Sequence, residues 1–424
     1  MASDPVEAVL RRFRVREDVL IVGDVDYFLS QFQRIFVVGA GKGVARMAKA
    51  VEQVLGARIH DGMVIVRQGY GERLGRIRVV EAGHPLPDEA SLKATHELIS
   101  LVDQADENDL VICLISGGGS SLLASPAGSI NLDDMQRATE LFLSSGMTIQ
   151  EINIVRKHIS RIKGGRLAQR VFPATLISLI LSDVIGDRLD VIASGPTVPD
   201  PSTFSYAVYI LGEYKIFDQM PERVKAVLEK GISGEEPETP DQTSEIFRRV
   251  QNLIVGSNRL SLKAAEYKAR RMGMNALILS SSIRGEAREL ARFYAALAEE
   301  IVKSESPVKA PACLIAGGEP TVTIRGSGKG GRNQELALAV AMEIQDLPGV
   351  VFLSAGTDGT DGSTDAAGAF SDSETIVRAR HRMLNPRDFL DNNNSYEFFL
   401  SMGDLILTGP TGTNVMDIHL LLVG

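Results

Sequence analysis

The sequence predicts an α/β protein built from two domains of about equal size. Six short apolar runs each end in Gly, Ser or Asp, as buried parallel strands do where they lead into ligand-binding loops. These runs alternate with amphipathic helical patterns, which is typical of a doubly wound parallel sheet. The chain has 424 residues, too many for one ordinary hydrophobic core.

In the first half, residues 1–30 read as a helical lead-in, after which strands and helices alternate. The helix at about 43–55 is amphipathic, and Asp88 is a plausible cap for the helix that follows Pro87. The expected strands cover 35–38, 62–66, 77–81, 109–115 and 175–181. The further expected helices cover 131–145 and 149–170.

Residues 230–246 lose apolar periodicity and gain Pro, Glu and Gly, so we place the domain boundary there. The expected domains are therefore 1–240 and 247–424. The expected strands of the second domain cover 252–255, 276–279, 312–316, 321–324, 350–354, 404–407 and 417–423. Its expected helices cover 258–272, 285–304 and 333–345.

The composition is that of a soluble globular protein, with 44% hydrophobic and 23% charged residues. The net charge of −9 provides no global basic field for nucleic acid or an anionic membrane. Cys113 and Cys313 lie inside apolar strands, and we interpret both as core residues. We expect a cytoplasmic protein, because no signal-peptide pattern and no apolar run of about 20 residues is found.

The first glycine-rich loop, residues 39–43, follows a strand and opens a helix. A helix N-terminus favours anions, and Lys42 adds a mobile positive charge, so Gly41 and Lys42 are predicted to bind a phosphoryl group. The alternative is a plain glycine turn with a solvated lysine. A dinucleotide fingerprint is incomplete, since Val44 replaces its third glycine and Arg67 stands where an acid is expected. No standard P-loop motif is present.

The second loop places three glycines and three serines directly after an apolar strand. Backbone N–H groups and hydroxyls in such a loop form a cradle for phosphate or carboxylate. The predicted binding residues are Ser116, Gly117, Gly118, Gly119, Ser120 and Ser121. Asp183 follows another very apolar strand and is a candidate base or metal ligand.

A basic stripe is predicted on the helix at 149–170. Residues three and four apart share one helix face, and Arg156 and Lys163 could hold anions there. A solvated helix face is the alternative, and the pattern leaves both open. The stripe consists of Asn153, Arg156, Lys157, Ser160 and Lys163.

In the second half, the loop at 326–335 enters a helix at Arg332, whose planar fork suits phosphate. Gly330, Gly331 and Asn333 share this loop and are predicted to bind the ligand. Asn258 and Glu319 each follow an apolar run and are further candidates for nucleotide or metal.

The loop at 356–365 is dense in carboxylates and hydroxyls. Oxygen ligands suit Mg²⁺, so Asp358 and Asp361 are predicted metal ligands together with Asp183. Ordinary Asp-Gly turns are the alternative.

Eight of these segments, in this order, resemble the class II glycerate kinases that carry a MOFRL domain at the C-terminus. The resemblance implies ATP- and Mg²⁺-dependent phosphorylation of D-glycerate, in this family usually to 2-phosphoglycerate. It also implies a Rossmann-like N-terminal domain, a MOFRL-type C-terminal domain and an active site in the cleft between them. Lys42 and Arg332 correspond to the expected catalytic cations. The segments begin at Val38, Gly83, Ser116, Asn153, Leu181, Ala193, Gly330 and Gly356.

The resulting hypothesis is that Lys42 and Arg332 bind the γ-phosphoryl oxygens while Asp183 orients the glycerate hydroxyl or binds Mg²⁺. The expected partners are D-glycerate and ATP, with no nucleic acid or membrane, and the expected state is a monomer or homodimer. One alternative is a hydroxypyruvate reductase that uses NAD(P)H. Another is a ligand-binding module that senses a nucleotide without turnover.

Overall fold

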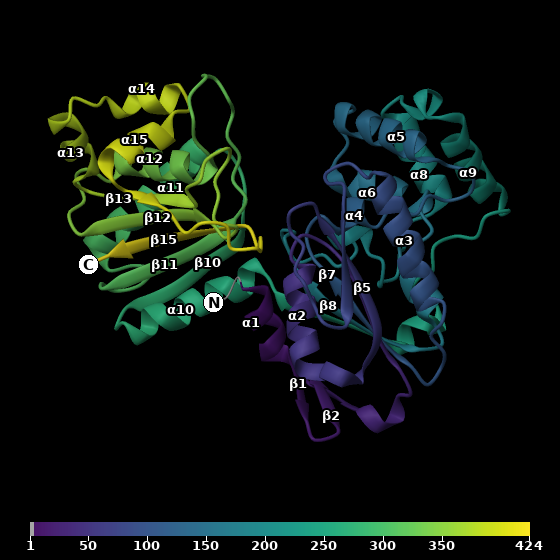
Figure 1. Ribbon diagram of the computed structural model, residues 1–424. Coiled ribbons are helices and arrows are strands. Elements are labelled where there is room, and N and C mark those ends of the chain that lie inside the picture. Colours follow the sequence, from purple (N-terminus) through teal and green to yellow (C-terminus); the bar gives the residue numbers. More distant parts are fainter. Residues whose placement is uncertain (1–3) are drawn as a thin grey trace. The chain divides into compact units, whose positions relative to one another are not determined.

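The computed structural model describes residues 4–424, which form two compact units (Figure 1). The N-terminal unit comprises Pro5–Val255, and the C-terminal unit comprises Gly256–Gly424 together with Asp4. The division follows Val255, later in the chain than the sequence pattern placed it. Each unit has its own sheet and its own core.

A six-stranded sheet of order β6-β5-β4-β7-β8-β9 forms the centre of the N-terminal unit. The pairs β6/β5, β5/β4, β4/β7 and β7/β8 are all parallel. The order reverses between β4 and β7, as in doubly wound sheets, where ligands bind beyond the carboxyl ends of the strands at this reversal. The strands are β4 (Ile35–Ala40), β5 (Ile59–Arg67), β6 (Ile77–Ala82), β7 (Leu110–Ile115), β8 (Thr175–Leu181) and β9 (Val250–Gly256).

Helices cover both faces of this sheet. One face packs against α3 and α7, and α2 lies on the other face beside α1 (Figure 1). A separate group of helices has its own apolar core, centred on Phe142 and Phe204. The first set is α1 (Pro5–Arg12), α2 (Val44–Leu55), α3 (Glu89–Val102), α4 (Gly119–Leu122) and α7 (Arg166–Val171). The second set is α5 (Leu132–Ser144), α6 (Ile149–His158), α8 (Phe204–Glu213) and α9 (Glu222–Ser233).

The prediction of a helical lead-in over residues 1–30 is wrong beyond α1. After that helix the chain forms a three-stranded antiparallel sheet, and residues 1–3 lie outside the described part. Each of its strands has only four residues, and only the first alternates apolar and polar residues while the second is wholly apolar, so hydrophobic periodicity does not separate them from a helix. They are β1 (Phe13–Arg16), β2 (Val19–Val22) and β3 (Val25–Phe28).

The polar segment 230–246 packs onto the N-terminal unit. Glu238 accepts hydrogen bonds from the backbone N–H of Phe204, and the Thr239 hydroxyl donates to buried Asp200 at 3.0 Å. The segment therefore lacks apolar periodicity because its polar side chains bond to the N-terminal unit, and it is not a free linker between domains. The strand expected at 252–255 is β9, which extends the N-terminal sheet beside β8.

The C-terminal unit holds a mixed sheet of order β10-β11-β15-β12-β13-β14. β10 and β11 are parallel, whereas β15 runs antiparallel to both β11 and β12 and so forms the centre of the sheet. The strands are β10 (Asn275–Ile283), β11 (Ala312–Gly318), β12 (Val350–Gly356), β13 (Gly368–Asp372), β14 (Leu405–Ile406) and β15 (Asp417–Val423).

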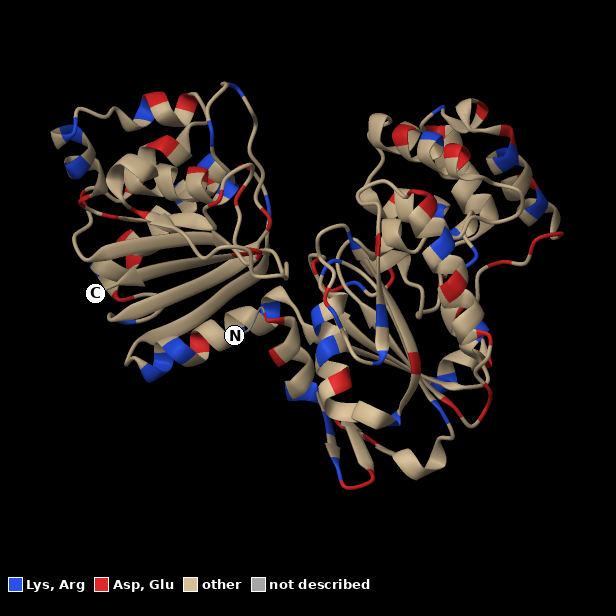
Figure 2. Ribbon diagram, in the orientation of Figure 1, with Lys and Arg blue, Asp and Glu red and all other residues tan. Residues whose placement is uncertain are grey.

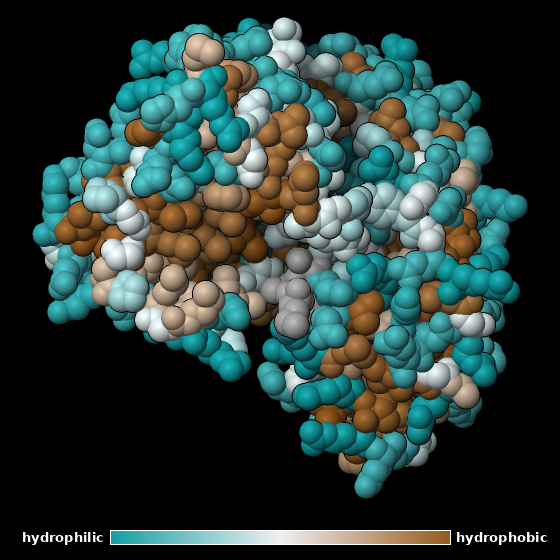
Figure 3. Space-filling model, turned by 60° about the vertical axis from the view of Figure 1, so that its left-hand side comes forward, coloured by the Kyte–Doolittle hydropathy of each residue, from teal (hydrophilic) through white to brown (hydrophobic). Residues whose placement is uncertain are grey.

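One face of the mixed sheet is buried under helices, and the other is only partly covered. Tyr294 of α11 and Leu336 of α12 pack with Phe352 and Leu421 of the sheet in the main core. Among residues 4–424, α10 is the one helix that packs on the opposite face, and it carries several basic residues (Figure 2). Figure 3 shows a broad apolar area on this unit. The helices are α10 (Asn258–Arg271), α11 (Ala287–Ser304), α12 (Arg332–Glu343), α13 (Thr375–His381), α14 (Pro386–Asp391) and α15 (Ser395–Met402).

The strand expected at 321–324 is absent from the described chain, where Thr321 makes only an isolated bridge to Glu286. The segment is instead part of a loop held by side chains of Glu286 and Asn393. Within residues 4–424, no helix combines the length and apolar character needed to cross a bilayer.

Candidate active site

The two glycine-rich loops of the N-terminal unit meet where the strand order reverses. The backbone N–H of Lys42 donates to the carbonyl of Gly117 at 2.8 Å, and the N–H of Gly43 donates to the Ser116 hydroxyl at 2.9 Å. Ser116 is buried, so its hydroxyl joins the loops rather than facing a ligand. The structure thus brings together the two loops that the sequence predicted separately.

Close packing explains two of the glycines. A Cβ atom on Gly41, whose φ is +145°, would lie 2.2 Å from the Ser116 Oγ. On Gly118, whose φ is +83°, it would lie 2.8 Å from His84 Nε2 and 3.4 Å from Lys42 Cε. The Gly118 backbone therefore lies directly beside Lys42 and His84.

His84 belongs to this cluster, although the sequence analysis assigned it no role. Burial, followed by the charges of Lys42 and Arg67, lowers the pKa of His84 to about 4. The imidazole is therefore neutral near pH 7 and can exchange hydrogen bonds with a ligand. His84 follows the end of β6, where ligand-binding loops of a parallel sheet lie, and that position was the sequence signal for a role in the site.

Asp183, which follows β8, lies against the same loop. A Cβ atom on Gly117 would stand 1.9 Å from Asp183 Oδ2. The loop after β7 therefore contacts Asp183 at Gly117 and lies beside the Lys42 side chain at Gly118. A cation and a carboxylate thus lie next to the same run of glycine backbone N–H groups.

A cavity of about 460 Å³ opens beside this loop, and Arg156 and Lys163 line it. The buried Lys163 ammonium donates to the carbonyls of Ser120 and Leu123 at 2.7 and 2.6 Å, which leaves one proton for a ligand. Burial, and then the charge of Arg156, lower the pKa of Lys163 to about 7.

Arg156 differs from Lys163 because no described residue accepts a hydrogen bond from it or pairs with its charge. Burial lowers the pKa of the Arg156 guanidinium from its usual value. A desolvated cation without a partner is costly unless a ligand compensates it. The cavity is therefore suited to an anion.

The predicted basic stripe does not remain on one helix face. α6 ends at His158, and Lys163 lies in the turn beyond it. Lys157 pairs with buried Asp200 at 3.2 Å, so that residue is structural. The prediction of a continuous helix to 170 is wrong, because residues 159–165 form an irregular turn before α7.

Asn153 and Ser160 act within the protein. Ser194 donates to Asn153 Oδ1 at 2.8 Å and lies 2.9 Å from the hydroxyl of Ser120, while the Ser160 hydroxyl donates to the carbonyl of Ser125. Asn153 thus supports Ser120 through Ser194. Ser121 donates to the Gly118 carbonyl, which tightens the loop.

In the C-terminal unit, Arg332 is held by two carboxylates. Its Nε and Nη2 donate to the two oxygens of Asp417 at 2.6 and 3.1 Å, and its Nη1 donates to Glu319 at 2.9 Å. Burial opposes the charge, but the hydrogen bond and charge of Asp417 raise the pKa of Arg332. The guanidinium is fixed in one orientation.

Asp417 is a functional candidate that the sequence analysis missed. It is buried at the start of β15, opposite Gly318 of β11 and Gly356 of β12. Those two glycine-ending strands were found in the sequence, but β15 runs the opposite way between them. Only the sheet register reveals that the first residue of β15 lies at their ends.

Asp361 caps α12. Its carboxylate accepts hydrogen bonds from the backbone N–H groups of Asn333 and Gln334 at 3.1 and 2.9 Å, and from the Asn333 side chain. Burial is the largest influence on the pKa of Asp361, and it raises that pKa to about 6. The charge of Asp417 acts in the same direction, whereas the hydrogen bonds from Asn333 and Gln334 act against it. Gly331 is required here, since its Cβ atom would stand 2.3 Å from Asp361 Cγ.

Two predicted ligand-binding asparagines are used internally. The side-chain amide of Asn258 donates to the carbonyls of Val415 and Asp417, and Asn333 Oδ1 accepts from Ser354 at 2.6 Å. Both asparagines are buried. They hold the loops that carry Asp417 and Asp361 rather than facing the cavity.

A cavity of about 520 Å³ borders Arg332, and its lining includes Glu319, Asp358 and Gly330. One oxygen of Asp358 accepts from the backbone of Thr360, which leaves the other free for a ligand. The part of the chain that the structure describes has no cluster of three or more metal-binding side chains. Mg²⁺ commonly uses one or two carboxylates plus substrate phosphates and water, and Asp358 with Glu319 fits that set.

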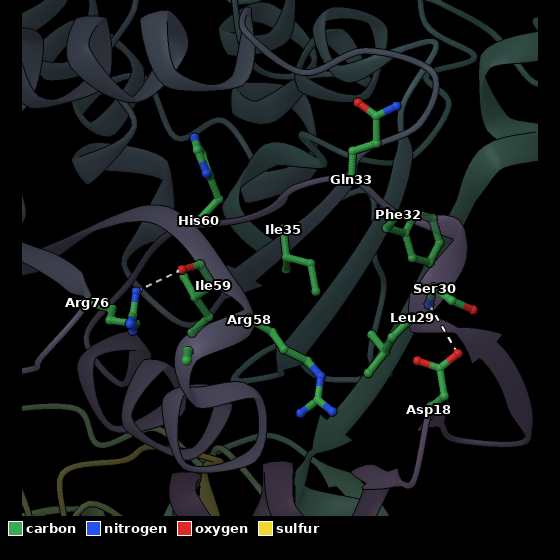
Figure 4. A pocket seen from close by; sticks show the side chains of 11 residues that line it. Asp18, Leu29, Ser30, Phe32, Gln33, Ile35, Arg58, Ile59, His60 and Arg76 are labelled. Carbon is green, nitrogen blue, oxygen red and sulfur yellow. Dashed lines mark hydrogen bonds between the residues drawn. The ribbon is translucent and has the colours of Figure 1, made fainter.

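A third cavity, of about 480 Å³, lies at the opposite edge of the N-terminal sheet (Figure 4). Ile35 and Ile59, the first residues of β4 and β5, line it together with exposed Arg58 and His60. Ligands of doubly wound sheets bind at the carboxyl ends of strands, so this cavity is outside the candidate site.

Family models match most of the chain. The model described as a domain of unknown function (DUF4147) matches residues 1–229, and that of the MOFRL family matches residues 312–417.

Individual relatives are similar over nearly the whole length. A glycerate 2-kinase from Pyrococcus horikoshii is 43% identical over 423 residues, which cover 100% of this chain and 94% of the relative. A D-glycerate 2-kinase from Thermotoga maritima is 45% identical over 392 residues, covering 92% of this chain and 91% of the relative. A crystal structure of a protein from Pyrococcus horikoshii OT3 matches with a TM-score of 0.91 and 43% identity, over 100% of this chain and 95% of that one.

Proposed function

The chain belongs to the family of glycerate kinases with a MOFRL domain, and on this premise we propose that it transfers the γ-phosphoryl group of ATP to D-glycerate, giving 2-phosphoglycerate. The observation that carries the proposal is the contrast between two cationic sites. In the N-terminal unit Arg156 lacks any described partner, whereas in the C-terminal unit Arg332 is already paired with carboxylates.

The N-terminal cavity is the proposed site of the glycerate carboxylate. A carboxylate would compensate Arg156 and take the remaining proton of Lys163, in charge-assisted hydrogen bonds. The 2-hydroxyl would then face the loop at 117–121. Ser120 is a candidate to bind it, because Ser194 and Asn153 fix its hydroxyl.

The C-terminal cavity is the proposed site of the ATP phosphates. Its carboxylates would repel bare glycerate but suit a nucleotide that carries a divalent cation. Asp358 and Glu319 are the proposed holders of Mg²⁺, which would neutralise phosphate charge. Asp361 is proposed to act through its cap on α12, since its oxygens are used by Asn333 and Gln334.

Lys42 and Arg332 are proposed to bind the γ-phosphoryl oxygens during transfer. Such a transition state is loose, so positioning and electrostatic stabilisation contribute more than a strong base. Asp417 holds the Arg332 fork by both oxygens, which leaves one N–H on each terminal nitrogen for the phosphoryl group. Asp183 and neutral His84 are proposed to orient the attacking hydroxyl.

³¹P NMR of products formed from ATP, Mg²⁺ and D-glycerate tests the proposal. We expect a phosphate-ester signal matching 2-phosphoglycerate, together with ADP. A 3-phosphoglycerate signal would keep the kinase and change the acceptor hydroxyl. Intact ATP with no ester would contradict the proposal, and oxidation of NADH by hydroxypyruvate would then favour the reductase.

A further inference from the structure

The acceptor cavity of the N-terminal unit is much larger and more apolar than glycerate requires. A volume of about 460 Å³ is within the range of sites for ligands far bigger than a three-carbon acid. Arg156 and Lys163 supply its cationic side, beside the 118–121 loop. The opposite wall consists of apolar side chains: Leu86, Pro87, Met135, Phe142, Leu143 and Ile159.

The two sides of the cavity come from different elements. Lys163 is bonded to the carbonyls of Ser120 and Leu123, which fixes the cationic side to α4. Half of the apolar wall comes from α5, whose Phe142 lies in the separate helical core and whose Met135 packs against it. A carboxylate at Arg156 would therefore direct the rest of an acid along an apolar surface.

We propose that this cavity takes 2-hydroxy acids as a class, including acids whose chain beyond C2 is apolar and longer than that of glycerate. The inference rests on the proposed function, which makes the cavity the acceptor site. In each case the 2-hydroxyl oxygen forms a bond to the γ-phosphorus, the bond from that phosphorus to ADP breaks, and the hydroxyl proton passes to solvent.

The lining favours this class over a strictly polar acceptor. Apart from Thr139 and exposed Glu140, the α5 wall offers no side-chain group that could hydrogen-bond a 3-hydroxyl. Burial of a methylene is worth about 0.8 kcal/mol, or about fourfold in affinity. Removing the 3-hydroxyl and adding carbons should therefore retain or improve binding.

The first test measures equilibrium binding of acetate, propionate and butyrate to the whole protein. These carboxylates lack a hydroxyl, so binding is read without catalysis. We expect the dissociation constant to fall by about threefold to fourfold for each added carbon. D-Glycerate should compete with butyrate, and Arg156→Ala should weaken binding of all three acids. A dissociation constant that stays the same or rises with chain length would overturn the inference. Competition from adenosine instead of D-glycerate would overturn it as well.

Variants test the wall itself. Leu143 is 67% exposed and Met135 is only partly buried, so the double variant Met135→Gln with Leu143→Asn replaces apolar wall without emptying the centre of the helical core. We expect it to flatten the dependence on chain length. The matched control is Ile232→Asn on α9, which is 50% exposed and does not line the cavity, and it should keep the full dependence. An unchanged dependence in the double variant would contradict the assignment.

The second test offers D-lactate and D-2-hydroxybutyrate as acceptors and follows phosphate esters by ³¹P NMR. We expect esters from both. An ester from D-glycerate alone, with a flat carboxylate series, would overturn the inference and leave the kinase intact. A rising affinity series without any ester would contradict the proposed kinase while the pocket assignment stands.

Discussion

The two units treat their cationic side chains in opposite ways. In the N-terminal unit Arg156 is largely desolvated and lacks a partner among the described residues, and Lys163 bonds only to backbone carbonyls. In the C-terminal unit Arg332 bonds to Asp417 and Glu319. The unpaired cations are suited to attract a small organic anion. The paired arginine is suited to hold a fixed direction, because its charge is already compensated.

The sheets differ in a related way. The central strands of the N-terminal sheet, β4 and β7, are buried along their whole length under helices on both faces. In the C-terminal sheet β12 and β15 are buried at every second residue. Because β15 runs antiparallel to β11 and β12, it begins at the edge where those strands end, and its first residue there is Asp417.

The largest expected effect comes from removing either of the two proposed catalytic cations. Arg332→Ala and Lys42→Ala should each lower turnover by about 10²-fold or more, because each removes an electrostatic stabiliser of the transition state. Steady-state kinetics measures this. The matched controls are Arg325→Ala, in the same loop as Arg332, and Lys49→Ala, on α2. A folded variant at either cation with near wild-type kcat would contradict its role.

Arg156→Ala should act on binding rather than on chemistry. Loss of a charge-assisted hydrogen bond should raise KM for D-glycerate by about 10- to 100-fold, with a smaller change in kcat. The thermal midpoint should stay level or rise, since the variant removes a desolvated charge without a partner. Arg161→Ala, whose exposed side chain bonds Gly128, is the control. A fall in stability with unchanged KM would make Arg156 structural.

Asp417→Asn should act on chemistry rather than on acceptor binding. The amide cannot hold both nitrogens of the Arg332 fork as acceptors, so kcat should fall by about 10-fold while KM for D-glycerate changes little. Asp404→Asn is the control for loss of a buried Asp–Arg contact, since Asp404 pairs with Arg378 at 2.9 Å outside the cavity. If Asp417→Asn and Asp404→Asn lose the same amount of kcat, Asp417 has only a structural role.

The smallest expected effect is a pH dependence from Lys163. Its pKa is lowered to about 7, so the ammonium is charged below that pH and neutral above it. KM for D-glycerate should rise by up to about tenfold between pH 6 and pH 8. Lys163→Met should flatten this dependence.

The stability of the protein should respond to Lys163 in the opposite sense. Between about pH 7 and 10.5 the unfolded chain binds the proton that folded Lys163 has lost, so its contribution to stability rises with pH. Denaturant titrations at several pH values, compared with Lys163→Met, measure this. A KM that falls as pH rises would contradict the assignment of a carboxylate to Lys163.

The sequence by itself determined the α/β class and the strand ends. Apolar runs such as those of β4 and β7 are buried because they are apolar, and the glycines after them are fixed by close contacts such as Gly41 with Ser116. The family motifs also led to the proposal that Lys42 and Arg332 are the catalytic cations. These features are local, so neighbouring residues suffice to encode them.

Only the tertiary structure decided which polar side chains are used up inside the protein. Asn258 and Asn333 stand at strand and helix ends as ligands would, but their partners, Asp417 and Ser354, are far away in the chain. The residues of the basic stripe also differ in their partners, because Lys157 pairs with Asp200 whereas Arg156 pairs with none of the residues that the structure describes. Whether a buried polar group has a hydrogen-bond partner depends on residues that folding brings together. The spacing of residues within one segment therefore does not predict those partners.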